Sequence, residues 1–146
     1  MLRALGLDGR QIADTKALMA DFSRNFSELE RSHSFLTNRL PNGEKSGEFP
    51  ALITKPFAAE AKAAAERFLG ELAAVMGRER AELYWSPNTL ESGSRERIRI
   101  LTRFKGNDMP FIEEYDQGHM THGVSFEALP EEFKPFAADW KPKPKP

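Results

Sequence analysis

Apolar residues recur at helical spacing through the first thirty residues of the chain. They line one face of a 3.6-residue repeat at Ile12, Met19, Phe22, Phe26 and Leu29. Asp8 precedes this stripe and suits the N-cap, because its carboxylate accepts hydrogen bonds from N–H groups of the first turn. Gln11 follows three residues later, as in a capping box. The first element is therefore predicted to be a long helix beginning at Asp8.

The end of this helix has two interpretations. The apolar spacing continues through His33, Leu36 and Leu40, which favours a seam of four heptads ending at Arg39. The segment 32–38 is rich in Ser, Thr and Asn, however, and these are poor helix formers. A turn signal at 41–43 and an apolar segment at 49–53 follow. We favour a hairpin of residues 33–40 with 48–54, in which Pro50 confines the second strand to an edge.

The second helix carries the clearest stripe of the chain. Pro56 suits its first helical position. The apolar face comprises Phe57, Ala61, Ala64, Ala65, Phe68, Leu72, Val75 and Met76. Gly77 then allows a left-handed cap or a kink. Residues 81–85 are expected to add one further helical turn before the Ser-Pro-Asn sequence at 86–88.

Residues 95–105 alternate as a strand does. Arginine and lysine recur at every second position except Leu101, while Ile98, Ile100 and Phe104 lie between them. This pattern predicts a half-buried strand with a cationic outer face and an apolar inner face. We expect Ile98, Ile100 and Phe104 to be core residues packed beneath the second helix.

The last third of the chain is predicted to continue the sheet. A strand at 111–115 lies between turns at 106–108 and 116–118, and alternation from Val124 to Leu129 predicts a third strand. Pro130 opens a short C-terminal helix whose Phe133, Phe136 and Trp140 pack inward. The Lys-Pro repeat at 141–146 is expected to be an extended, solvated tail.

These elements predict an α+β fold of two layers. An antiparallel sheet of three to five strands packs against two main helices, with a short C-terminal helix. The chain has 146 residues, so residues 1–140 are expected to form one domain and 141–146 the tail. A net charge of −1 gives no global attraction to nucleic acid or membranes. The absence of cysteine excludes disulfides, thiolate chemistry and cysteine-bound metals.

The sequence contains no apolar run of the length that spans a bilayer, so no membrane span is predicted. The N-terminal residues lack the apolar centre of a signal peptide. We therefore expect a cytoplasmic protein, with the cell envelope as the alternative if a targeting segment has been removed.

The cationic strand face is the first candidate site. Arg97, Arg99, Arg103 and Lys105 stand two or more residues apart in a row and could bind phosphates or an acidic partner. The strand that follows carries Glu113, Glu114 and Asp116, so the competing interpretation is a hairpin that neutralises itself. We favour neutralisation, because surface charges alone are weak evidence of function.

The second candidate is a divalent metal site formed by Asp116, His119 and His122. Their spacing belongs to a glycine-containing turn rather than to one helix face, so a polar hairpin loop is the favoured interpretation. The sequence shows no nucleophile elbow, phosphate-binding loop or dinucleotide fingerprint. No cofactor is predicted, and an enzyme is less favoured than a binding protein.

The function predicted first is therefore a small non-enzymatic interaction or assembly module. Its N-terminal helix carries a long apolar seam, which favours self-association or another protein as the partner. The predicted interface residues are Met19, Phe22, Phe26 and His33. An anionic ligand or nucleic acid bound by the arginine strand is the alternative, with nucleic acid not favoured. A metal-dependent enzyme using His119 and His122 is the second alternative.

Overall fold

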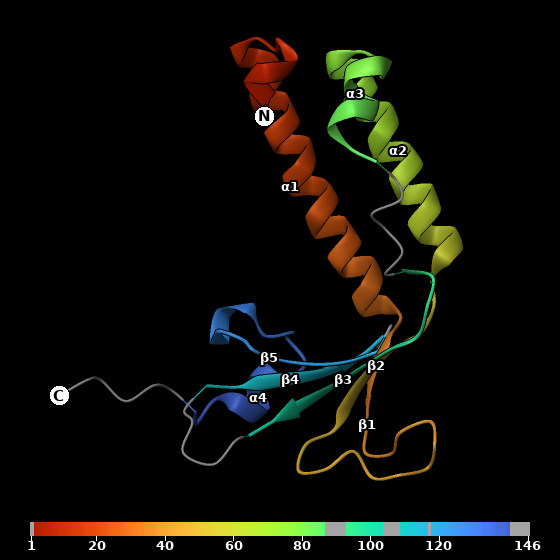
Figure 1. Ribbon diagram of the computed structural model, residues 1–146, viewed down its shortest axis with the longest axis vertical. Coiled ribbons are helices and arrows are strands. Elements are labelled where there is room, and N and C mark those ends of the chain that lie inside the picture. The colour runs from red at the N-terminus through yellow and green to blue at the C-terminus, as the bar shows by residue number, and fades with distance from the viewer. Residues whose placement is uncertain (1, 87–92, 104–108, 117, 141–146) are drawn as a thin grey trace, which may run out of the picture. The chain divides into compact units, whose positions relative to one another are not determined.

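The computed structural model describes residues 2–86, 93–103, 109–116 and 118–140. It contains four α-helices and a five-stranded antiparallel sheet, which confirms the predicted α+β class and the short C-terminal helix (Figure 1). The chain forms two compact units. One comprises residues 1–33 and 56–95 and the other residues 34–55 and 96–146. The chain thus passes between the units three times, and the single domain predicted over residues 1–140 stays a prediction.

The helical unit is a hairpin of two long helices. A 3-10 turn, η1 (Leu2–Leu5), precedes α1 (Gly9–Ser32), and α2 (Ala58–Met76) runs antiparallel beside it before the short α3 (Arg78–Tyr84) (Figure 1). The predicted capping box is present. Asp8 Oδ1 accepts from the Gln11 backbone N–H at 2.8 Å, and Gln11 Oε1 accepts from the Asp8 N–H at 3.0 Å. Because α1 ends at Ser32, the favoured hairpin interpretation is confirmed and the helix to Arg39 is wrong.

The core of this unit is built mainly from α2. Phe68, Leu72 and Met76 are almost completely buried, and Ile12, Met19 and Phe22 of α1 pack against them. Phe22 stacks on Phe68 with ring centroids 4.4 Å apart. Helix packing by ridges and grooves explains this arrangement, because both stripes follow 3-4 spacing.

The two ends of α2 differ from each other in how they are formed. Phe57 is the N-cap, so Pro56 lies before the helix rather than at its predicted first position. Phe57 donates its backbone N–H to Gly93 O at 2.8 Å, which draws that segment against the helix start. At the other end Gly77 has φ +86°, a conformation that favours glycine, and α3 begins directly after it.

The sheet is a simple meander in chain order. Its strands are β1 (Ser34–Thr37), β2 (Ala51–Thr54), β3 (Arg97–Thr102), β4 (Phe111–Tyr115) and β5 (His119–Gly123). The placement of β2 at an edge was wrong, because β2 pairs with both β1 and β3. Pro50 is compatible with this central position since the strand begins at Ala51, one residue later.

The third predicted strand was placed too late in the chain. Residues 119–123 form β5, while Phe126–Ala128 form a 3-10 turn, η3. Every residue of β5 is exposed, so this edge strand needs no apolar alternation. That exposure explains why the expected pattern pointed to the wrong segment.

The side of the sheet that carries its main core was also predicted wrongly. Leu101 shares a face with Arg97 and Arg99, and it packs with Leu52 and Ile112. The C-terminal segment covers these residues with Leu129, Phe133, Ala137 and Trp140, the last two from or beside α4 (Lys134–Ala137). The inward packing predicted for Phe133, Phe136 and Trp140 is therefore confirmed. Arginine stems can lie beside apolar residues while their charged ends extend away.

The opposite face of β3 is apolar as well, but only in part buried. Ile100 is 7% exposed, which confirms it as a core residue, and Ile98 is half-buried, while Phe104 lies outside the described residues. The predicted turn at 106–108 and the Lys-Pro tail at 141–146 also lie outside them. Among the described helices, none combines the length and the apolar character needed to cross a membrane.

Candidate functional site

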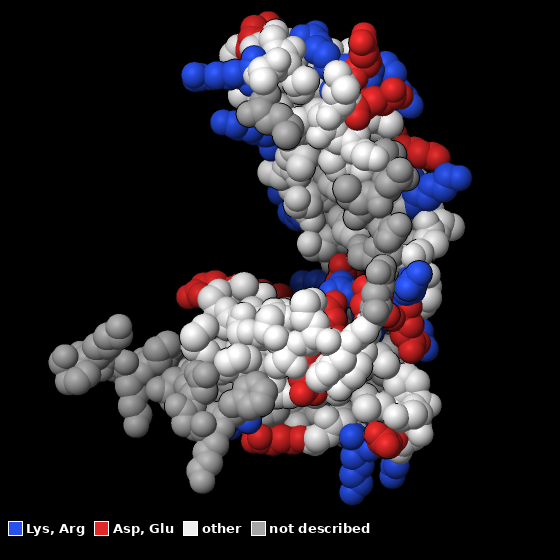
Figure 2. Space-filling view, viewed as in Figure 1, with Lys and Arg blue, Asp and Glu red and all other residues white. Residues whose placement is uncertain are grey.

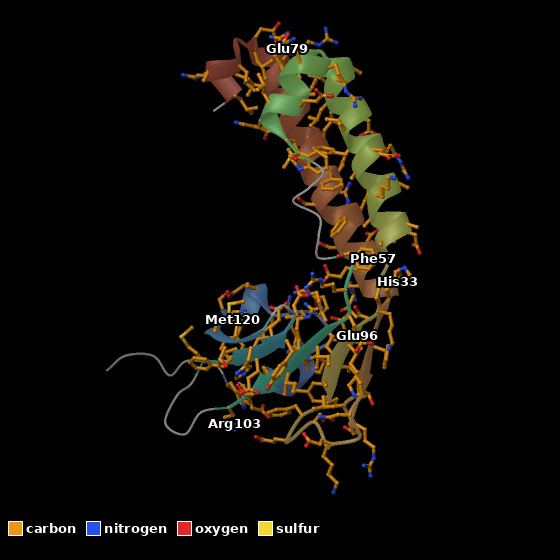
Figure 3. All side chains as sticks on the ribbon, turned by 45° about the vertical axis from the view of Figure 1, so that its right-hand side comes forward. His33, Phe57, Glu79, Glu96, Arg103 and Met120 are labelled. Carbon is orange, nitrogen blue, oxygen red and sulfur yellow. The ribbon has the colours of Figure 1, made fainter. Side chains whose placement is uncertain are left out.

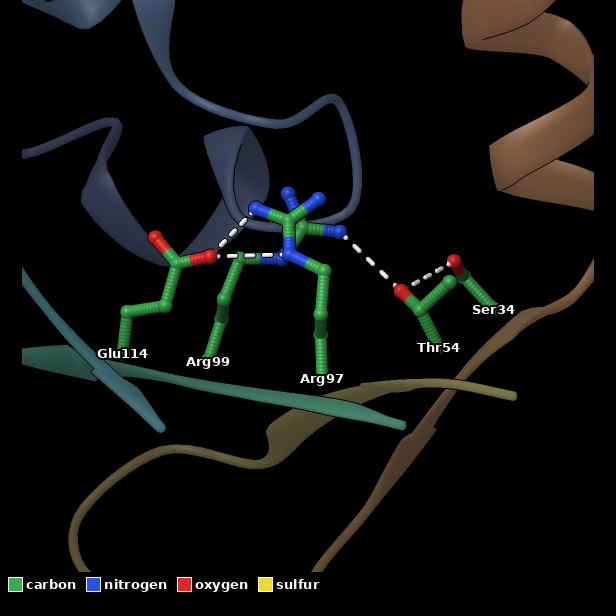
Figure 4. A network of polar contacts seen from close by, with 5 residues as sticks. All are labelled: Ser34, Thr54, Arg97, Arg99 and Glu114. Atoms are coloured by element: carbon green, nitrogen blue, oxygen red, sulfur yellow. Dashed lines mark hydrogen bonds and ion pairs between the residues drawn. The ribbon is translucent and has the colours of Figure 1, made fainter. Parts of the chain in front are cut away.

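Two arginines of β3 form a polar network on the face that carries the sheet core (Figure 4). Arg97 donates from Nε to Glu114 Oε1 at 2.8 Å and also from Nη2 to the same oxygen. Arg99 donates from Nη2 to Thr54 Oγ1 at 3.2 Å, and that hydroxyl lies 2.7 Å from Ser34 Oγ. The network therefore joins side chains of four consecutive strands. The sequence did not single out Thr54 or Ser34, because their roles depend on strand register.

Glu114 is the carboxylate of β4 that shares this face. It lies opposite Arg99 in the strand register, and its side chain reaches diagonally to Arg97. The Arg97 and Glu114 side chains are only 16% and 15% exposed, so water screens their attraction less than on an open surface. Glu113 pairs with Ile100 and lies on the other face. The predicted neutralisation is thus made by one of the three carboxylates rather than by all of them.

The predicted row of cations is interrupted at its far end. Arg103 lies over Trp140, with its guanidinium carbon 4.2 Å from a ring centroid, and its Nη2 is 3.6 Å from Glu48 Oε1. This cation–π contact draws Arg103 toward the apolar C-terminal segment. Lys105 lies outside the described residues. Arg97, Arg99 and Arg103 consequently do not form the single continuous row that would follow a phosphodiester backbone.

The three residues of the predicted metal site do not converge. His119 and His122 lie on opposite faces of β5, because side chains three apart on a strand point to opposite sides. His119 stacks on Tyr115 with ring centroids 4.7 Å apart, while His122 pairs with Ile112. Asp116 lies in the turn before β5. Within the described ranges, no group of three or more His, Asp or Glu side chains is placed to hold a metal ion.

Tyr115 lies on the face of the sheet opposite to the arginines, and its pKa is shifted. Burial raises the pKa of its phenol above the ordinary value of 10.0, and the nearby negative charge of Glu113 and a hydrogen bond to it raise the pKa further. His119 Nε2 lies 3.9 Å from Glu113 Oε1 on the same face. Tyr115, His119 and Glu113 thus form a partly exposed polar cluster that no motif of the sequence indicated.

The helical unit carries a surface groove that involves two of the predicted interface residues. It is a groove of about 380 Å³ between α1 and α2. Its lining from α1 comprises Asp21, Phe22, Asn25, Phe26 and Leu29, and from α2 Glu60, Ala63, Ala64, Arg67, Phe68 and Glu71. The lining mixes apolar side chains with polar and charged ones, as in grooves that accept an amphipathic helix.

Two of the four predicted interface residues line this groove. Phe22 and Phe26 line it, whereas Met19 packs into the core of the hairpin. His33 caps the end of α1, stacks on Phe57 at 5.3 Å and places Nε2 3.0 Å from Glu60 Oε1 (Figure 3). His33 therefore makes its contacts within the helical unit. The α2 half of the groove was missed, although the small residues Ala63 and Ala64 beside Phe68 were its signal.

Charges of both signs alternate along the helical unit, without a large patch of one sign on the described surface that Figure 2 shows. Arg24 pairs with Asp21 at 2.5 Å and Arg78 with Glu82 at 2.7 Å. Arg67 differs from these residues, because its guanidinium makes no hydrogen bond or ion pair among the described residues. It is therefore a charged group on the groove rim that remains available to a partner.

No protein-family model, curated protein or solved structure matches the chain in comparisons with known proteins.

Proposed function

We propose that the chain is a non-enzymatic assembly module that associates with a second copy through its helical unit. The observation that carries this proposal is the groove of about 380 Å³ between α1 and α2. The contact between α1 and α2 leaves Phe22, Phe26 and Leu29 half-buried. In bundles of four helices such residues are covered by a second pair.

The occupant that fits best is a second copy of the same hairpin. A two-fold interface places one patch against itself, so the patch must be self-complementary. An antiparallel contact of two α2 helices about an axis between Ala63 and Ala64 meets this requirement. Both alanines line the groove and carry the smallest apolar side chain, so the two backbones approach closely.

The rim charges supply the complementarity of this arrangement. With the axis between residues 63 and 64, Arg67 of each copy stands opposite Glu60 of the other. Both side chains are on the groove rim, and Glu60 keeps a second carboxylate oxygen beside the one that faces His33. Two Arg–Glu pairs would thus form, one on each side of the axis. Charges of this kind set register and orientation more than they add affinity.

Sedimentation equilibrium of the full chain over a concentration series tests the proposal. We expect a reversible association whose limiting mass is twice the 16.5 kDa of one chain. The substitution Arg67→Glu places like charges together at two points and should weaken dimerisation about tenfold or more. Lys62→Glu is the matched control, because Lys62 is an exposed residue of α2 outside the groove.

Two outcomes would contradict this function. The first is a monomer mass at every concentration. The second is an equal weakening by Arg67→Glu and Lys62→Glu, which would show that total charge rather than the groove controls association. Circular dichroism of each variant establishes that the helices are intact, so that lost association is not mistaken for unfolding.

A further inference from the structure

The arginine face of the sheet borders an open cavity that self-association of the helical unit does not use. Its volume is about 140 Å³, enough to admit several water molecules. Arg97 and Arg99 line it from β3, Glu114 from β4 and His122 from β5. The C-terminal segment contributes Val124, Ala128 and Pro130 to the lining. All of these residues belong to the sheet unit.

Both guanidinium groups are held in position before any ligand arrives. Glu114 accepts from two N–H groups of Arg97, and Thr54 holds one N–H of Arg99 (Figure 4). Thr54 is completely buried and is itself fixed by the contact with Ser34. Because these side chains stand on paired strands, ligand binding would freeze little further motion.

The chemistry of this lining favours an oxyanion. A guanidinium is planar, always charged and carries five N–H donors, so it can bond to protein acceptors and to an anion at the same time. Two such groups and an imidazole border the cavity, against one carboxylate. The low exposure of Arg97 strengthens its charge-assisted bonds relative to those of a surface arginine.

The size of the cavity suits a small anion. Arg103 is occupied by Trp140 and Glu48 outside the cavity lining, so the cationic groups do not continue along the strand. We propose that the cavity is a binding site for a single small oxyanion, such as phosphate, sulfate or a carboxylate, held by Arg97 and Arg99. A nucleic-acid strand would need a longer row of phosphate contacts.

Nuclear magnetic resonance titration of the full chain with inorganic phosphate, sulfate and acetate tests this proposal at constant ionic strength. Saturable shifts are expected at the Arg97 and Arg99 Nε–H signals and at the amides of β3 and β5. Tighter binding of phosphate and sulfate than of acetate identifies a tetrahedral anion as the preferred ligand. The reverse order identifies a carboxylate.

Three substitutions make the test specific. Arg99→Lys keeps the charge but removes the planar donor pair, so we expect the dissociation constant to rise about tenfold. Arg103→Lys is the matched control, one residue beyond the end of β3, and should leave binding unchanged. Glu114→Gln removes the one negative charge of the lining, so it should tighten anion binding by several-fold in the molecules that remain folded.

The pair of opposite effects separates a binding site from a structural network. A network that serves stability alone would show no saturable shifts, or shifts that survive Arg99→Lys. Weaker binding in Glu114→Gln would equally overturn the proposal. Binding of a labelled oligonucleotide with a steep salt dependence, lost in both Arg99→Lys and Arg103→Lys, would replace the small anion by nucleic acid.

Discussion

Glu114 lies opposite Arg99 in the strand register, yet its carboxylate is bonded to Arg97. This diagonal contact links β3 and β4 on the face that carries the main sheet core. Both side chains are about five-sixths buried, so removing one partner leaves the other poorly solvated. The pair is thus a structural element of the sheet unit, whatever the cavity beside it binds.

We expect Glu114→Gln to lower the free energy of unfolding by about 1.5–3 kcal/mol, the range for hydrogen bonds to charged groups. Urea unfolding followed by circular dichroism measures this loss. Glu113→Gln is the control on the opposite face and should cost less than about 1 kcal/mol. Equal losses for the two variants would show that the face of the sheet does not determine the importance of the carboxylate.

Gly93 approaches the start of α2 too closely to carry a side chain. A Cβ atom at this position would lie 2.9 Å from Ala61 Cβ and 3.3 Å from Phe57 Cε2. Because the Ala61 Cβ is fixed to a helix backbone, Gly93→Ala should destabilise the chain by about 1–3 kcal/mol. Gly70→Ala in the exposed middle of α2 meets nothing within 4 Å and should stabilise by about 0.5–1 kcal/mol. Thermal unfolding of both variants measures the difference, and the same sign for both would contradict this close approach.

Phe133 tests the second layer of the sheet unit. Its side chain is fully buried against the cluster of Leu52, Leu101 and Ile112, whereas Phe136 is half-buried at the edge of that cluster. We expect Phe133→Ala to cost about 3–5 kcal/mol and Phe136→Ala clearly less. Denaturant unfolding gives both values. A near-neutral Phe133→Ala would mean that the C-terminal segment does not cover the sheet.

The pKa of Tyr115 predicts a specific alkaline behaviour. Burial and the neighbouring Glu113 raise this pKa above 10.0 in the folded chain, so the folded state keeps the proton more firmly than the unfolded state. The contribution to stability is therefore complete below pH 10 and is lost as the pH rises through the folded-state pKa. Ultraviolet titration of the phenolate, assigned with Tyr115→Phe, measures it. Glu113→Gln should lower the pKa, and an unchanged value would contradict the assigned cause.

The helical elements could be predicted from the sequence because their signals are local. Asp8 and Gln11 form the capping box within a single turn, and Gly77 ends α2 by its own backbone freedom. The core face of β3 could not be predicted in this way. Leu101 lies on the same face as the arginines of β3. Only its contacts with Leu52 and Ile112 on other strands identify that face as the core.

The candidate sites depended even more on distant contacts. The network requires the register that brings Glu114, Arg97 and Thr54 together, and no spacing along the chain encodes that register. The groove requires Phe22 and Phe26 of α1 to lie beside Ala64 of α2. His119 and His122 do not form a metal site, because the loop predicted from the sequence is the strand β5 in the structure. A strand places side chains three residues apart on opposite faces.

The exchange of charges between positions 60 and 67 tests the assembly model most directly. Arg67→Glu and Glu60→Arg should each weaken dimerisation about tenfold or more, because each creates like-charge contacts at both ends of the two-fold interface. The double variant restores both Arg–Glu pairs in reversed order, so sedimentation equilibrium should return its dissociation constant to within a few-fold of the unmodified chain. A double variant that is as weak as, or weaker than, the two single variants would contradict this interface.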